Sequence, residues 1–123
     1  MNGKRHMIVI VEDDAGLRRA LERLLRYSGF RTRSFRSAED ANIFEFASMA
    51  RCLVIDVQLP GISGPAFYDT LHSPRPPAVF MTAYDGVRTR GAMESTGAHA
   101  LLTKPFSGKA LVEAISNATA SAR

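Results

Sequence analysis

Asp56 closes a short run of strand-forming apolar residues at 52–55 and is followed by a loop that contains Pro60, Gly61 and Gly64. An apolar run of this length, bounded by turn residues, predicts a buried β-strand. An ionised carboxylate at the end of a buried strand is costly unless its charge is used. We therefore interpret Asp56 as a residue with a chemical role.

Two other apolar runs also end in charged residues. Residues 7–11 lead into Glu12, Asp13 and Asp14, and residues 100–102 precede the isolated Lys104. The carboxyl ends of parallel strands meet at one edge of a sheet, where open α/β folds place their ligands. The three runs predict a polar site at such an edge.

Helical patterns alternate with these strands along the chain. Strands are expected at about 7–11, 30–35, 52–56, 79–82 and 98–102. Helices are expected at about 17–26, 38–47, around 67–71, 87–96 and from 108 to 118. Short parallel strands need helical crossovers, so the fold class is α/β. We predict a three-layer α/β/α sandwich on a doubly wound, five-stranded parallel sheet of order 2-1-3-4-5, which is flavodoxin-like.

Two of the helices have weaker signals than the others. Ser37 is a candidate cap for the helix at 38–47, whose apolar face is not clean. The segment 87–96 contains Gly91 and only Val87, Ala92 and Met93 as convincing apolar residues. We expect this segment to be the most loosely packed helix.

The length of 123 residues fits a single domain over 1–123. No apolar run approaches the roughly 20 residues of a membrane span, and the N-terminus lacks a signal peptide pattern, so we expect a soluble cytoplasmic protein without membrane contact. The single cysteine, Cys52, is expected to be a packed thiol in a buried strand.

The net charge is +4, and 13 of the 16 basic residues are arginine. A positive net charge is compatible with nucleic acid as a partner. The arginines are scattered, however, and no basic helix interleaved with aromatic residues is present. We interpret them as a solvated basic surface and expect no direct nucleic acid binding by this domain.

Four short motifs of this chain, in their order and spacing, resemble those of the receiver domains of two-component response regulators. The matching segments are Val11-Glu12-Asp13, residues 56–61 with Gly64, Thr82-Ala83 and Lys104-Pro105-Phe106. Each motif alone is weak, but together they span nearly the whole chain. The loops and the Lys-Pro-Phe segment are also similar to those of receivers attached to helix-turn-helix DNA-binding domains.

The resemblance implies roles for individual residues. Asp56 is the expected phosphoacceptor, Thr82 donates a hydrogen bond to the phosphoryl group, and Lys104 pairs with its oxygens. The implied ligands of Mg²⁺ or Mn²⁺ are Glu12, Asp13, Asp56 and the main-chain carbonyl of Gln58. The alternative acidic pair is Asp13 with Asp14, although Asp14 is also explained as a cap of the first helix.

Three further positions follow from the resemblance. A cis peptide bond is expected before Pro105, where it places Lys104. The switch position, commonly aromatic, is Leu101, which can exchange rotamers but lacks an aromatic hydrogen-bonding group. Tyr84 is either a cover over the pocket or an exposed loop residue.

The implied function is a receiver that takes phosphate from a sensor histidine kinase or phosphotransfer protein. Phosphorylation would act on the face of the 87–96 helix, the 98–102 strand and the last helix, which is also a candidate homodimer surface. No enzymatic activity is expected beyond Mg²⁺-dependent self-phosphorylation and slow self-dephosphorylation. Because the chain ends soon after the last helix, either the receiver acts alone or an output domain normally follows Arg123.

Two alternatives from other classes remain. A pseudo-receiver would keep the fold as a protein-interaction module without using phosphate. Leu101 and the basic surface favour it slightly, whereas the retention of all five pocket residues argues against it. A small phosphohydrolase with an aspartyl nucleophile would usually carry a second acid two residues after it, where this chain has Gln58.

Overall fold

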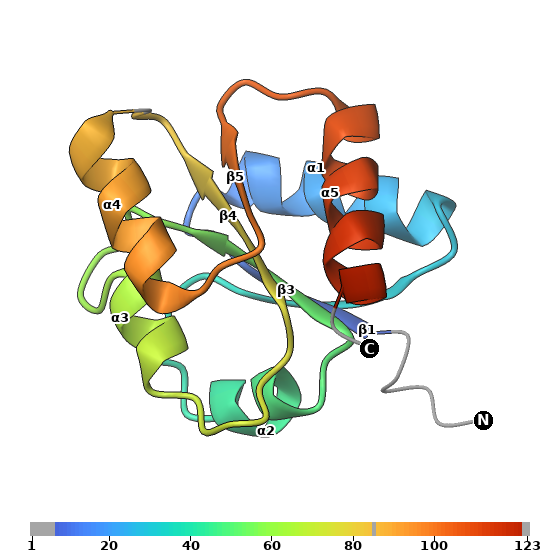
Figure 1. Ribbon diagram of the computed structural model, residues 1–123. Helices are drawn as coiled ribbons and strands as arrows, with labels where there is room; N and C mark the ends of the chain where they lie inside the picture. The colour runs from blue at the N-terminus through green and yellow to red at the C-terminus, as the bar shows by residue number, and fades with distance from the viewer. Residues whose placement is uncertain (1–6, 85, 122–123) are drawn as a thin grey trace.

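The computed structural model describes residues 7–84 and 86–121, and its elements alternate as the sequence predicts (Figure 1). The strands are β1 (Met7–Val11), β2 (Arg31–Phe35), β3 (Cys52–Asp56), β4 (Ala78–Thr82) and β5 (Ala100–Thr103). The helices are α1 (Ala15–Tyr27), α2 (Ile43–Ser48), α3 (Gly64–Asp69), α4 (Val87–Thr96) and α5 (Gly108–Ser121). The sheet order is β2-β1-β3-β4-β5 with every pair parallel, which confirms the predicted fold class.

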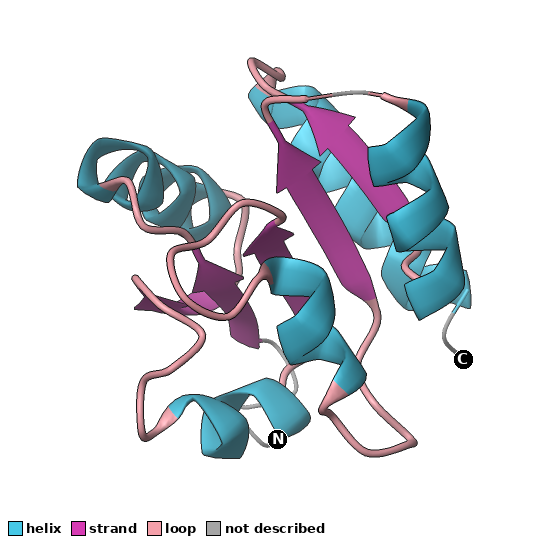
Figure 2. Ribbon diagram, turned by 90° about the vertical axis from the view of Figure 1, so that its left-hand side faces the viewer, coloured by secondary structure: helices cyan, strands magenta, loops and turns pink. Residues whose placement is uncertain are grey.

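Helices cover both faces of the twisted sheet (Figure 2). In Figure 1, α1 and α5 lie over one face, and α2, α3 and α4 lie over the other. The central strands β1, β3 and β4 are apolar on both sides because both of their faces are buried.

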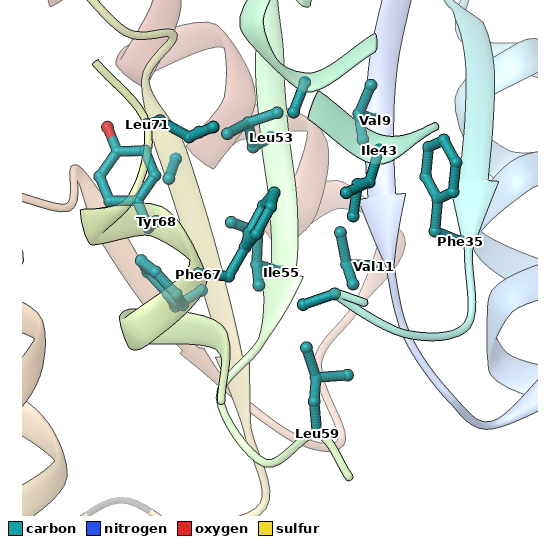
Figure 3. Close-up of a cluster of buried hydrophobic side chains, with 14 residues drawn as sticks. Val9, Val11, Phe35, Ile43, Leu53, Ile55, Leu59, Phe67, Tyr68 and Leu71 are labelled. Carbon is teal, nitrogen blue, oxygen red and sulfur yellow. The ribbon is translucent and has the colours of Figure 1, made fainter. Parts of the chain in front are cut away.

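Two cores result, one on each face of the sheet. Figure 3 shows the core beneath α2 and α3, which includes Val9, Val11, Phe35, Ile43, Leu53, Ile55, Phe67, Tyr68 and Phe80. The opposite core, beneath α1 and α5, contains Ile8, Ile10, Leu21, Leu25, Cys52, Val54, Met81, Leu111 and Ile115. Cys52 is a packed thiol as predicted, and burial raises its pKa to about 12.

The strand register places the three polar strand ends at one level. Val11 lies beside Ile55, so Glu12 follows β1 at the height of Asp56. Asp56 lies beside Met81, one residue before Thr82, and Thr82 lies beside Thr103, one residue before Lys104. The carboxyl edge of the sheet therefore carries all the predicted chemistry.

The predicted start of the second helix is wrong, and the fifth strand begins at Ala100 and not at residue 98. The helix expected over 38–47 with Ser37 as its cap begins only at Ile43, after Asn42. Ser37 accepts the amide of Glu39 on its hydroxyl at 2.9 Å, and Asp40 accepts the amide of Asn42 at 2.9 Å. These local side-chain bonds compete with helical hydrogen bonding and keep the segment in turns.

The helix predicted over 87–96 forms as α4. Val87 is 91% exposed and does not join either core. The side chains of Ala92 and Met93 lie outside the described residues, so the loose packing of this helix stays a prediction. No helix in the part of the chain that the structure describes is long and apolar enough to cross a bilayer.

Candidate functional site

Three carboxylates converge at the ends of β1 and β3. Glu12 and Asp56 are 1% and 3% exposed, whereas Asp13 is exposed. One oxygen from each of the three lies within 4.8 Å of the others. Asp14 instead caps α1, since its carboxylate accepts the amides of Gly16 at 2.9 Å and Leu17 at 3.2 Å. The structure thus assigns Glu12 and Asp13 to the acidic cluster and leaves Asp14 to the helix.

Lys104 joins two of these acids. Its Nζ donates to Glu12 Oε1 at 2.9 Å and to Asp56 Oδ2 at 2.8 Å. The backbone amide of Lys104 donates to the carbonyl of Thr82 at 2.7 Å, so β4 fixes the start of this side chain. The peptide bond between Lys104 and Pro105 is cis, as predicted.

Burial and neighbouring charges shift the pKa values of Glu12 and Lys104. Burial raises the pKa of Glu12 from 4.5 to about 7, although the Asp14 amide and Lys104 partly offset that rise. Burial alone would lower the pKa of Lys104, but its bonds to Asp56 and Glu12 raise it above the ordinary value. The two carboxylates therefore favour the charged form of Lys104.

Thr82 ends β4 as a fully buried residue with a crowded hydroxyl group. The Oγ1 atom lies 3.1 Å from Gln58 Oε1 and 3.0 Å from the Tyr84 carbonyl, both acceptors, and it accepts the Tyr84 amide at 3.0 Å. Tyr84 therefore contacts Thr82 through its main chain, while the residue as a whole is 68% exposed. Its role as a cover over the pocket stays a prediction.

The Gln58 side chain is a site group that sequence reasoning missed, because only its main-chain carbonyl was considered. Its contact with Thr82 crosses from the loop after β3 to the end of β4. The signal in the sequence was its position two residues after Asp56, in a loop that must pass the pocket. The carbonyl of Gln58 as a metal ligand stays a prediction.

The loop after Asp56 depends on a close backbone approach. Gly64 begins α3, and its amide donates to the carbonyl of Val57 at 3.2 Å. A Cβ atom at this position would overlap the main-chain carbonyl oxygen of Asp56. Only glycine fits here without moving the residue that carries the central carboxylate.

Arg18 is a second group that sequence reasoning missed. From α1, its guanidinium donates to the main-chain carbonyls of Glu12 at 2.9 Å and of Asp13 at 3.4 Å. These bonds hold the backbone of the loop that carries two of the three acids. An arginine six residues after the first acid, on a helix that starts beside it, was the available signal.

Leu101 lies in the middle of β5 and is partly buried. It packs against the core beneath α2 and α3. The structure therefore describes an inward side chain at the predicted switch position, and an exchange with an outward rotamer stays a prediction.

The family model of the response regulator receiver domain matches residues 8–116. The chain belongs to this family. Among curated relatives, this receiver is 32% identical over 115 residues to nodulation protein W of Bradyrhizobium diazoefficiens, which covers 92% of the chain and 51% of that protein. It is 35% identical over 111 residues to response regulator protein FleR of Pseudomonas aeruginosa, covering 88% of the chain and 23% of FleR.

Solved structures of receivers resemble this one over most of their length. The receiver protein from Burkholderia phymatum has 30% identity and a TM-score of 0.80, covering 93% of this chain and 94% of that one. A CheY-like receiver domain from Methanospirillum hungatei has 22% identity and a TM-score of 0.85, covering 94% of each chain, which shows the shared fold. The chain spans about half or less of the curated relatives named above.

The acidic cluster of this receiver fits a divalent cation of the hard type. Carboxylate oxygens are the ligands that Mg²⁺ and Mn²⁺ prefer, and three of them already converge here. Such a cation would also reduce the repulsion among the acids. The predicted residues Glu12, Asp13, Asp56, Thr82 and Lys104 are all brought to this one edge.

Proposed function

We propose that this receiver accepts a phosphoryl group on Asp56 and uses it to control an output. The observation that carries the proposal is the Lys104 ammonium group, which bridges Asp56 and Glu12 from a different strand. A buried nucleophilic carboxylate beside a cation, acidic metal ligands and a hydroxyl is the set that phosphoryl transfer to aspartate requires.

In the proposed step, a carboxylate oxygen of Asp56 attacks the phosphorus atom of the donor. The bond between phosphorus and the donor's leaving atom breaks, and its electron pair leaves with the donor. For a histidine kinase or phosphotransfer protein the leaving atom is an imidazole nitrogen. The product on this chain is an acyl phosphate.

The neighbouring residues have separate tasks in this proposal. Glu12, Asp13, Asp56 and the Gln58 carbonyl would hold Mg²⁺ or Mn²⁺, which supplies charge neutralisation for the transferred group. Lys104 would move its hydrogen bond from Asp56 to a phosphoryl oxygen. Thr82 would donate a hydrogen bond from its hydroxyl to another phosphoryl oxygen.

The movement of Thr82 and Lys104 connects the site to the face formed by α4, β5 and α5. Thr82 ends β4 and leads into the segment before α4, and Lys104 follows β5. A phosphoryl group can shift this face only if one conformation binds it better than the other, and Thr82 supplies that difference. We propose this face, with Leu101, as the output surface and as a candidate homodimer surface.

The relatives suggest the class of output. The C4-dicarboxylate transport transcriptional regulatory protein DctD of Rhizobium meliloti is 28% identical over 108 residues, which cover 86% of this chain and 24% of that protein. By analogy, we propose that this receiver acts in the cytoplasm to regulate transcription through another domain or partner. We expect no direct nucleic acid binding by the receiver and no catalysis beyond its own phosphorylation and dephosphorylation.

Incubation with Mg²⁺ and acetyl phosphate tests the chemistry. Intact-mass spectrometry should detect one phosphoryl adduct on the wild type and none on Asp56→Asn, whose amide is nearly isosteric but a poor nucleophile. Asp13→Asn is expected to lower labelling through weaker metal binding while leaving the nucleophile in place. Absence of any adduct on the wild type, under conditions that label a known receiver, would leave the pseudo-receiver as the function.

A further inference from the structure

Gln58 links the proposed phosphoacceptor to the hydroxyl of Thr82. Its backbone amide donates to Asp56 Oδ1 at 3.0 Å. Its side-chain Oε1 lies 3.1 Å from Thr82 Oγ1. One residue thus contacts both groups between which the proposed signal must pass.

A threonine hydroxyl has one proton to donate. In this receiver the Thr82 proton has two acceptors, Gln58 Oε1 and the Tyr84 carbonyl oxygen, which lies 3.0 Å away. Because Thr82 is fully buried, water is a poor substitute for these partners. A phosphoryl oxygen on Asp56 can accept a hydrogen bond from this hydroxyl only after its hydrogen bonds to both acceptors are broken.

We infer that Gln58 is a positioning residue that holds Thr82 in its unphosphorylated arrangement. The inference rests on the proposed function and adds a regulatory role to the Gln58 side chain. The Gln58 amide oxygen and the phosphoryl group compete for the same proton. Breaking the hydrogen bond between Gln58 and Thr82 therefore offsets part of the free energy with which Thr82 binds the phosphoryl group.

The Gln58→Met variant removes this acceptor and keeps an unbranched side chain of similar length, whose thioether sulfur accepts hydrogen bonds only weakly. Gln58 is exposed, so the substitution should leave the fold intact. The Tyr84 carbonyl remains as an acceptor, which limits the effect. Losing one hydrogen bond of ordinary net strength corresponds to roughly two- to tenfold in an equilibrium constant.

Beryllium fluoride with Mg²⁺, a mimic of the phosphoryl group, tests the inference by titration monitored with ¹⁹F NMR. Gln58→Met should bind it roughly two- to tenfold more tightly than the wild type. The same substitution should have no effect in a Thr82→Val background, which lacks the hydroxyl, and should keep its effect in a Thr82→Ser background. Unchanged affinity, or an equal gain in the Thr82→Val background, would overturn the role of Gln58.

A second measurement separates this inference from the proposed function. If the wild type binds no beryllium fluoride, the phosphoacceptor function fails. The resting contact is then tested by methyl NMR of Thr82 without any phosphoryl mimic. Gln58→Met should shift the Thr82 methyl resonance and raise its exchange between rotamers, and an unchanged resonance would refute the contact itself.

Discussion

The two halves of the carboxyl edge differ in how firmly the chain holds them. The acid half, residues 12–18 and 56–64, contains buried Glu12 and Asp56, and its loops are fixed by Arg18 and Gly64. The response half, residues 82–103, contains buried Thr82 but also an exposed Val87 and a largely exposed Tyr84. From this difference we predict that the charge-holding half is preorganised and that the half expected to respond is packed less tightly.

Substitution of one glycine in each half should give the largest expected difference in the free energy of unfolding. Gly64→Ala should lower the free energy of unfolding by about 3 kcal/mol, because its Cβ would overlap the Asp56 carbonyl oxygen. A Cβ at Gly91, in α4, meets no atom within 4 Å beyond its chain neighbours and the backbone of its own helix. Gly91→Ala should therefore raise stability by about 0.5 to 1 kcal/mol through helix propensity.

Chemical denaturation of both variants measures this contrast. Equal losses of stability would show that the two halves are packed alike. A Gly64→Ala variant as stable as the wild type would show that the Asp56 backbone has room to move. The prediction of a preorganised acid half would then be wrong.

The second prediction concerns the pH dependence of the acid half. Burial raises the pKa of Glu12 to about 7 in the folded receiver, whereas the same carboxyl group in the unfolded chain has the ordinary pKa of 4.5. The folded state thus binds more protons between these values, and this residue lowers the free energy of unfolding as pH rises through them. Without divalent metal, Glu12→Gln should gain stability relative to the wild type by on the order of 2 kcal/mol from pH 4.5 to pH 8.

Urea unfolding at several pH values in EDTA measures that difference. A constant difference between variant and wild type across this range would mean that Glu12 titrates normally. The buried acid would then be better solvated than its position indicates.

The strand order, the converging strand ends and the assignment of Asp14 to the helix could all be predicted from the sequence. Buried strands read as continuous apolar runs, and their ends reveal which residues meet, because parallel register carries each terminus to one edge. The start of α2 could not be predicted, because Ser37 and Asp40 favour local turns over a helix of ordinary propensity. The contacts of Gln58 and Arg18 were missed because side-chain directions across loops depend on tertiary packing.

The third prediction separates neighbouring acids by function. Mg²⁺ should raise the melting temperature of the wild type by preferential binding to the folded state. The double variant Glu12→Ala with Asp13→Ala should lose this rise. Asp14→Ala should keep it while losing about 1 kcal/mol of stability with the helix cap.

Differential scanning fluorimetry across a Mg²⁺ titration is sufficient for this test. A rise that survives in the double variant but disappears in Asp14→Ala would reverse the assignment of the metal ligands. The acid half would then be organised around the loop and not around the buried strand ends.

Amide hydrogen exchange with acetyl phosphate and Mg²⁺, compared with Mg²⁺ alone, tests most directly whether charge on Asp56 is transmitted to the response half. We predict that changes in amide exchange are concentrated in residues 82–103 of the wild type, with little change in α1. Asp56→Asn should show no change in exchange anywhere. An adduct confirmed by mass, with exchange in residues 82–103 unchanged, would contradict the proposed coupling between the two halves.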